Sequence, residues 1–180
     1  MKCLVEKDLL PYDVDGYLQR IKNIPWITEW VEFYIQEALQ CFNSNCIEAA
    51  VIMLGLSSEK MIDEQIDSLA GYLSRNFIVE HKQFLDGQLK AKNVSDKYNL
   101  FINSFGEVKK KNTDPSFKKI SLEMDSVAQK VYLNFTRITR NGLAHPSDTK
   151  MERIEVLMIF ISFIKYCETQ YALSDYFLTH

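Results

Sequence analysis

The sequence predicts an all-α fold, an up-and-down bundle of four or more helices with long core helices. Apolar residues recur at spacings of three and four over several long stretches, which is the period of an amphipathic helix. No stretch of useful length shows the alternation of apolar and polar residues expected of a half-buried strand. Four prolines and six glycines in 180 residues leave room for long elements. We expect residues 1–180 to form a single domain, which a chain of this length can support.

The N-terminal part of the sequence predicts an irregular or partly helical lead-in segment followed by two long helices. Residues 1–24 are mixed in character and are expected to be irregular or partly helical. Pro25 is suited to the first position of a helix, where its missing N–H is not needed, and apolar residues then recur in helical spacing to about Phe42. Residues 43–45 form a polar break. The helix beyond this break carries apolar residues over more than six turns, namely Ile47, Ala50, Val51, Leu54, Met61, Ile62, Ile66, Leu69 and Leu73.

The middle of the chain has a weaker pattern. Short helices are expected around residues 80–91 and near 98–105, where a few apolar residues are suitably spaced. Residues 106–115 are expected to form a basic, polar loop because they hold three consecutive lysines and end in a proline. A clearer helix follows, with apolar residues stepping by threes and fours from Ile120 to Ile138.

The last two long helices are expected to be separated near Gly142 and Pro146, because both residues disfavour continuation of a helix. Thr149 and Glu152 have the spacing of a capping box at the start of the final helix. A helix with an apolar surface wider than one stripe is typical of a central position or a subunit interface. The final helix has such a surface, formed by Ile154, Leu157, Met158, Phe160, Ile161, Phe163 and Ile164.

The composition is typical of a soluble globular protein, with 47% hydrophobic and 25% charged residues. The first residues lack the apolar core of a secretory leader. The longest apolar-rich run, residues 156–164, is shorter than the ~20 residues that span a bilayer. We therefore expect a cytoplasmic protein with no membrane partner.

Charge is unevenly distributed along the chain, although the net charge is only −3. Residues 1–70 hold 5 basic and 12 acidic side chains, whereas residues 71–180 hold 16 basic and 12 acidic ones. A nucleic acid partner is therefore expected to meet the C-terminal part of the chain.

The four cysteines, Cys3, Cys41, Cys46 and Cys167, form no CxxC pair and do not cluster with histidine. Their spacing gives no basis for a zinc site, and the sequence indicates no metal and no other cofactor. We expect them to be small core residues in a reducing compartment.

One short segment combines residues suited to cleavage of a phosphodiester, Arg140-Asn141-Gly142-Leu143-Ala144-His145-Pro146. Arginine offers a planar cation for phosphate, and histidine moves protons near neutral pH. On an uninterrupted helix the Arg140 and His145 side chains would point about 140° apart and could not share a substrate. Gly142 permits a bend and Pro146 disfavours helical dihedrals at His145, so both side chains can reach one side. Asn141 can donate a hydrogen bond to a phosphate oxygen.

A second segment, Arg75-Asn76-Phe77-Ile78-Val79-Glu80-His81, also has an arginine, an asparagine directly after it and then a histidine, here with five residues between the arginine and the histidine. It lacks the glycine and proline that would bend the backbone, and β-branched residues occupy its middle. Arg75 also lies at the end of an expected helix, where it can interact with terminal carbonyl groups instead. Arg140 and His145 are therefore the preferred pair, and a contribution from Arg75 and His81 stays open.

The Arg140–Pro146 motif resembles the signature of the HEPN superfamily (higher eukaryotes and prokaryotes nucleotide-binding). The family motif is an arginine, a polar residue that is often Asn, Asp or His, and then a histidine after four to six residues in all. In that family it lies between the last two long helices of a helical bundle, which is the expected position of residues 140–145. The resemblance in architecture covers about residues 25–171, and only the motif is specific.

Many HEPN proteins are metal-independent endoribonucleases, often toxins or effectors in bacterial defence, and many are dimers whose two motifs meet in one composite cleft. The resemblance therefore implies that His145 is the acid/base residue, that Arg140 binds the scissile phosphate and that Asn141 assists. It also implies RNA as the substrate, a homodimer, and a partner such as a cognate antitoxin or a nucleotidyltransferase.

Six further residues are weaker candidates. Glu59 lies on the second long helix, where acidic residues can support the arginine in such folds, and a solvated surface glutamate is the alternative. Five lysines could contact RNA phosphates without reading the base sequence, or could belong to a solvated loop. They are Lys109, Lys110, Lys111, Lys118 and Lys119.

Two other functions fit the same residues. A non-catalytic HEPN-like helical module would serve dimerisation, RNA or nucleotide binding, or docking to a partner protein. An unrelated helical adaptor would use Arg140 and Asn141 as helix caps and His145 in a turn. Resemblance in fold alone does not choose among these functions.

Overall fold

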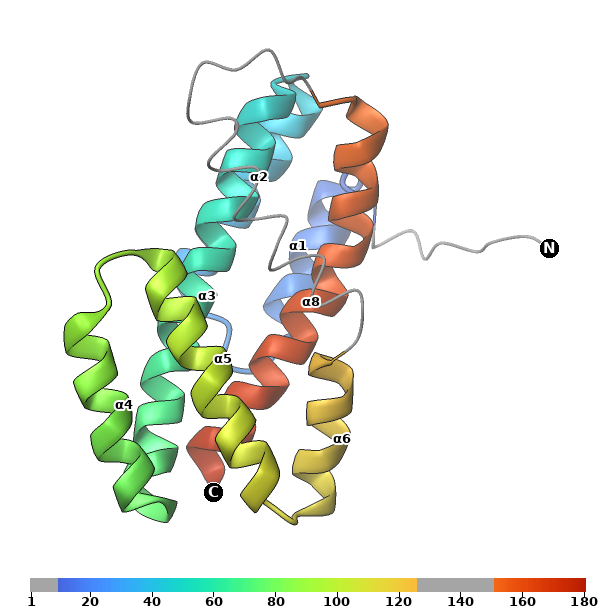
Figure 1. Cartoon of the computed structure of the whole chain (residues 1–180). Helices are drawn as coiled ribbons and strands as arrows, with labels where there is room; N and C mark the ends of the chain where they lie inside the picture. Colours follow the sequence, from blue (N-terminus) through green and yellow to red (C-terminus); the bar gives the residue numbers. More distant parts are fainter. Residues whose placement is uncertain (1–9, 126–150) are drawn as a thin grey trace.

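The computed structural model describes residues 10–125 and 151–180, and within these residues it contains seven helices and no strand. The helices pack lengthwise into a bundle (Figure 1), so the predicted all-α fold is confirmed. Residues 1–9 of the expected lead-in lie outside the described part, and the rest of it is partly helical as expected. The helices are α1 (Val14–Lys22), α2 (Glu29–Asn43), α3 (Ile47–Asn76), α4 (Ile78–Lys90), α5 (Val94–Lys111), α6 (Pro115–Met124) and α8 (Arg153–Thr179).

The core lies where α8 packs against α1 and α3, and α2 pairs with α3 on the other side. Figure 1 shows α3 and α8 descending side by side through the length of the bundle. In the core the ring of Phe160 on α8 contacts both the ring of Phe42 on α2 and the ring of Tyr17 on α1. The Tyr17 hydroxyl also donates a hydrogen bond of 2.8 Å to the Phe160 carbonyl oxygen. The prediction that the final helix is central is therefore confirmed.

By length and composition α8 would also be able to cross a membrane, and it is the one helix of the described part for which this holds. Of the 18-residue apolar stretch of α8 that has this character, 56% is buried inside the bundle. A core helix of a globular protein has this character as well, because a helix that is apolar on most sides must be covered on most sides.

The prediction that α2 begins at Pro25 is wrong. The chain first closes a turn at Pro25 and Trp26, and Trp26 adopts the left-handed region with φ of 68°. The helix begins at Glu29, and Thr28 is its N-cap residue. The Thr28 hydroxyl does not cap α2 but donates to Glu64 on α3 at 2.6 Å. A tertiary contact therefore determines where the helix starts.

The prediction of a basic loop over residues 106–115 is also wrong for most of its length, because α5 continues to Lys111. Phe101, Phe105 and Val108 are buried at helical spacing and carry the helix through this segment. The break is confined to residues 112–114. Asp114 ends it by accepting a hydrogen bond of 2.7 Å from the Ser116 backbone N–H, which caps α6.

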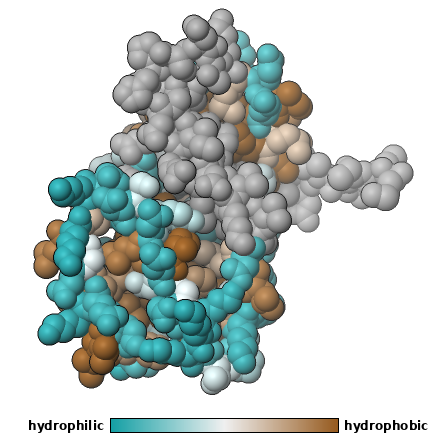
Figure 2. Space-filling view, viewed as in Figure 1, coloured by the Kyte–Doolittle hydropathy of each residue, from teal (hydrophilic) through white to brown (hydrophobic). Residues whose placement is uncertain are grey.

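Helices α4, α5 and α6 form an outer layer on the lower part of the bundle (Figure 1). The α4 helix buries one side chain, Phe84. Gly87 brings it close to α5, since a Cβ at this position would lie 2.5 Å from Leu100 Cδ1. Figure 2 shows hydrophobic residues exposed at the edge of the molecule where α4 runs.

The helix expected from Ile120 to Ile138 is wrong in its bounds where the structure describes it, because α6 begins earlier, at Pro115, and ends at Met124 with Asp125 as its C-cap residue; residues 126–150 lie outside the described part. At the start of α8 the capping box is formed by Glu152 and Glu155, not by Thr149 and Glu152. Glu152 is the N-cap residue, and its backbone N–H donates to the Glu155 carboxylate at 2.8 Å. A glutamate thus takes the role that the pattern assigned to threonine.

The three cysteines in the described part are free thiols in different surroundings. Cys167 is buried, and burial raises the pKa of its thiol. Cys41 is half-buried, whereas Cys46 is exposed at the start of α3, so the prediction of a core role is wrong for Cys46. Cys3 lies outside the described residues.

Candidate functional site

The three residues predicted to be catalytic, Arg140, Asn141 and His145, lie outside the described residues. The described chain leaves off after α6 and resumes just before α8, so the segment that carries them joins these two helices in sequence. The described part of the chain contains the weaker candidates, Glu59 and the five lysines, together with cavities.

Three of the five candidate lysines, at the C-terminal end of α5, form ion pairs with carboxylates. Lys109 pairs with Asp125 and Lys111 with Glu80 on α4, while Lys110 pairs with Glu107 at 2.6 Å. The bond from Lys111 lowers the pKa of Glu80. Lys109 and Lys111 thus link α5 to its neighbours, Lys110 pairs within α5, and each of the three has an acidic partner that offsets part of its charge.

Lys118 and Lys119 differ from the other three because they are exposed on α6. Within the described part of the chain, neither forms an ion pair. They are thus the two candidate lysines whose charge is available to an approaching phosphate. Glu59, the predicted supporting acid, is half-buried on α3.

In the second segment, residues 75–81, the arginine and the asparagine bind the C-terminal end of α8. Arg75 Nη2 donates to the Phe177 carbonyl oxygen at 2.5 Å, and Asn76 donates to the His180 carbonyl oxygen at 3.2 Å. These carbonyl groups belong to the last turn of α8, where a cation also complements the helix dipole. His81 lies one turn into α4, beyond these contacts. The arginine and asparagine are therefore capping residues, and the geometry gives no shared site with His81.

A polar cluster beside these caps ties α3, the α5–α6 turn and α8 together. The Asn112 amide donates to the hydroxyls of Tyr72 and Tyr176 at 2.9 and 3.0 Å. The Tyr176 hydroxyl donates to Asp114 at 3.1 Å. Burial, followed by the neighbouring Tyr176, raises the pKa of Tyr72 to about 12, so its hydroxyl stays protonated at physiological pH. The cluster has the character of a structural clamp.

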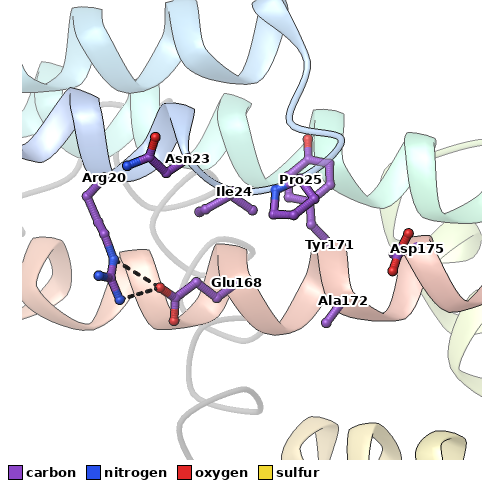
Figure 3. Close-up of a pocket in the computed structure, with 8 residues that line it drawn as sticks. All are labelled: Arg20, Asn23, Ile24, Pro25, Glu168, Tyr171, Ala172 and Asp175. Atoms are coloured by element: carbon purple, nitrogen blue, oxygen red, sulfur yellow. Dashed lines mark hydrogen bonds and ion pairs between the residues drawn. The ribbon is translucent and has the colours of Figure 1, made fainter.

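The pocket that sequence reasoning missed lies between the α1–α2 turn and α8, and its volume is about 340 Å³. Figure 3 shows Arg20 reaching down from α1 to Glu168 on α8. The Arg20 Nε and Nη2 atoms donate to one Glu168 oxygen at 3.1 and 2.7 Å. At the other end of the pocket Asp175 accepts a hydrogen bond of 2.6 Å from the Trp26 indole.

The wall between these two ends is apolar, and a half-buried acid, Glu64, lies behind it. Pro25 and Tyr171 line it, and the Tyr171 hydroxyl donates to Glu64 at 2.7 Å. Burial, and then the bond to Glu64, raises the pKa of Tyr171 far above its usual range. Glu64 also accepts the hydrogen bond from Thr28 and has Lys60 at 3.8 Å.

The pocket has charged ends but no arrangement of a nucleophile and a base. Its carboxylates already accept hydrogen bonds, and histidine and cysteine do not line it. A concave, partly apolar pocket of this size can hold a small molecule. No local sequence pattern could have revealed it, because Arg20 and Glu168 are 148 residues apart in the chain.

A second hollow lies between α5 and α6 and has a volume of about 570 Å³. Tyr98, Ile102 and Phe105 form its apolar floor, and the Lys109–Asp125 ion pair lies at its side. Across the described ranges no group of three His, Cys, Asp or Glu side chains is arranged to hold a metal ion.

The comparisons with known proteins assign no family. No family model, no curated protein and no solved structure matches the chain. The resemblance to HEPN proteins therefore depends on the Arg140–Pro146 motif and its position in a helical chain.

Proposed function

We propose that the protein is a metal-independent endoribonuclease of the HEPN type. The observation that carries this proposal is the sequence Arg140-Asn141-Gly142-Leu143-Ala144-His145-Pro146, placed before the last long helix. The all-helical bundle supports it, because such motifs in the family lie between long helices. The capping role of Arg75 and Asn76 also supports it, since the arginine and asparagine of the competing segment are engaged by carbonyl groups at the end of α8.

In the proposed reaction a base takes the proton of an RNA 2′-hydroxyl, and that oxygen forms a bond to the adjacent phosphorus. The bond from phosphorus to the 5′-oxygen breaks, and an acid protonates the leaving oxygen. His145 is the proposed proton carrier, and the Arg140 guanidinium stabilises the charge that develops on the phosphate oxygens. Asn141 assists by donating to a phosphate oxygen. DNA lacks the 2′-hydroxyl and is not expected to be cleaved.

One histidine does not readily act as base and acid in the same step. A homodimer would bring a second His145 to the scissile phosphate, which is the reason to expect two copies. Lys118 and Lys119 are the lysines best placed to add sequence-independent contacts to RNA, because they are exposed and have no described ionic partner.

A second candidate function is a non-catalytic helical module that binds RNA, a nucleotide or a partner protein such as a nucleotidyltransferase. The ion pairs of Lys109, Lys110 and Lys111 favour the protein-docking form of this module, because they reduce the positive potential available to RNA. A toxin or defence role with a cognate antitoxin belongs to the first candidate.

The test is cleavage of a mixed-sequence single-stranded RNA in the presence of EDTA. We expect the wild-type protein to produce fragments ending in 2′,3′-cyclic phosphate, and we expect Arg140→Ala and His145→Ala to lower the rate at least ~100-fold. Arg75→Ala and His81→Ala are matched controls that should retain cleavage. Circular dichroism would verify that all four variants keep their helices.

An inert wild-type protein, or a His145→Ala variant that still cleaves, would contradict the nuclease proposal. Binding of RNA without cleavage would then favour the module. Loss of cleavage in His81→Ala but not in His145→Ala would transfer the site to the rival segment.

A further inference from the structure

The outward face of α4 carries a row of exposed apolar side chains. Ile78, Leu85 and Leu89 follow one another at spacings of seven and four, and Val79 lies beside them. Ile78 is 77% exposed and Leu89 is 87% exposed, the largest fractions among the exposed large hydrophobic residues of the described part. We call Ile78, Val79, Leu85 and Leu89 the α4 stripe.

The opposite face of α4 is already used within the chain. Phe84 is buried against the core, Gly87 lies against Leu100 of α5, and Glu80 pairs with Lys111. At 100° per residue these positions lie on the side of the helix away from Ile78, Leu85 and Leu89. In Figure 1 α4 is the outermost helix of its layer, so the stripe faces away from the bundle. Several large apolar side chains gathered on one outer helix are typical of an interaction surface.

The spacing of the α4 stripe fits a helix as its partner. Lys82 lies between Ile78 and Leu85 on the same face of α4. Positions 78, 82, 85 and 89 are therefore separated by four, three and four residues, which is the spacing of contact positions between two packed helices. Lys82 and Asp86 are exposed next to the stripe, and in the described part of the chain neither forms an ion pair. A partner complementary to this face would offer apolar residues together with one acid and one base.

We propose that this partner is α4 of a second copy of the chain, packed antiparallel about a two-fold axis near residues 83 and 84. In this arrangement Ile78 faces Leu89 of the second copy, and Lys82 comes next to Asp86 of the second copy. The same pairs then occur twice, as a two-fold contact requires. A parallel arrangement would put Lys82 of one copy against Lys82 of the other, and the two like charges would repel.

The size of the contact sets the expected strength. A helix of 13 residues is about 20 Å long, so the contact lies near or below the ~1,200 Å² at which stable interfaces begin. We expect a dimer that forms at tens of micromolar and dissociates on dilution. This contact is distinct from the homodimer proposed for catalysis, in which two His145 residues meet, because the α4 stripe includes neither Arg140 nor His145.

The test exploits the two-fold pairing of charges. Lys82→Asp alone places two acids together across the axis, and Asp86→Lys alone places two bases together. Each variant is expected to raise the dimer dissociation constant at least ~10-fold. An equimolar mixture of the two should restore dimerisation, because the new acid of the first variant then meets the new base of the second, and the unchanged Asp86 meets the unchanged Lys82. Sedimentation equilibrium from about 5 to about 200 µM, with one variant carrying a mass tag, would identify the mixed dimer.

Two more variants separate the stripe from general surface effects. Leu89→Glu should abolish dimerisation through α4, whereas Leu122→Glu, at an α6 residue that is 71% exposed outside the stripe, should leave it unchanged. A dimer through the Arg140–Pro146 motifs is expected to respond to neither variant. These side chains are exposed, so the helical content should stay constant. A wild-type protein that is monomeric at about 200 µM would overturn the proposal, as would a dimer insensitive to all α4 variants. RNA cleavage, measured separately, distinguishes failure of this interface from failure of the proposed activity.

Discussion

The α3 helix buries 15 of its 30 residues, whereas α4 buries 1 of its 13. The two helices follow one another directly in the chain, so the difference comes from what packs against each of them. α3 lies between α2 and α8 and is covered on several sides. α4 is covered by α3 and α5 on one side and is open on the other.

The contrast extends to the contacts that hold each region. The inner region of α1, α2, α3 and α8 is held by aromatic rings in contact, such as Phe42 with Phe160 and Tyr72 with Phe177. The outer layer also has rings in contact, such as Phe105 with Phe117, but α4 has one buried side chain and joins α5 through the surface ion pair of Glu80 and Lys111, of a kind that contributes about 0–1 kcal/mol. We therefore expect the inner region to determine global stability and α4 to open first.

The largest expected effect is that of Phe160→Ala in the inner region. Phe160 is fully buried between Tyr17 and Phe42, and its removal leaves a cavity where two other rings meet. We expect the free energy of unfolding to fall by about 3–5 kcal/mol, measured by urea denaturation. Met158→Ala, at an exposed residue on the same helix, is the matched control and should change it by less than about 0.5 kcal/mol. Similar losses in both variants would show that α8 is not the centre of the core.

A smaller and more local effect is expected for Phe84→Ala. Phe84 is the one buried residue of α4, so its loss releases this helix while α3 keeps its contacts with α2 and α8. We expect a global loss of roughly 1–3 kcal/mol, smaller than for Phe160→Ala, because α4 can open on its own. Hydrogen exchange should become fast in residues 78–90 and stay slow in α3. Equal acceleration in α3 and α4 would mean that the two regions unfold as one unit.

The same contrast explains which elements could be predicted from the sequence. The inner helices α3 and α8 bury long runs of apolar residues, so their period is visible in the sequence and both were predicted. The start of α2 was wrongly predicted at Pro25 because it depends on the Thr28–Glu64 contact, which joins residues 36 apart. The helix through residues 106–111 was missed because its three lysines outweighed Phe105 and Val108 in the pattern.

The candidate site divides along similar lines. The Arg140–Pro146 motif is local in sequence, so it could be found without a structure, and it stays a prediction. The α1–α8 pocket depends on Arg20 meeting Glu168 and on Trp26 meeting Asp175, two pairs that lie 148 and 149 residues apart and that no periodicity encodes. The role of Arg75 as a cap was anticipated in kind, but the carbonyl group it binds belongs to α8 and not to its own helix.

The smallest expected effect concerns how tightly the outer layer is packed. Gly106 lies inside α5, and a Cβ added there meets no atom within 4 Å. Because glycine costs a helix interior roughly 0.5–1 kcal/mol relative to alanine, Gly106→Ala should raise the free energy of unfolding by about that amount. Gly87→Ala gains the same stabilisation from replacing a glycine within a helix. It also forces Leu100 to move away from the new Cβ, so this variant should be less stable than Gly106→Ala. Thermal unfolding of the two variants measures the difference. Equal gains would mean that the α4–α5 contact is as loosely packed as the exposed side of the outer layer.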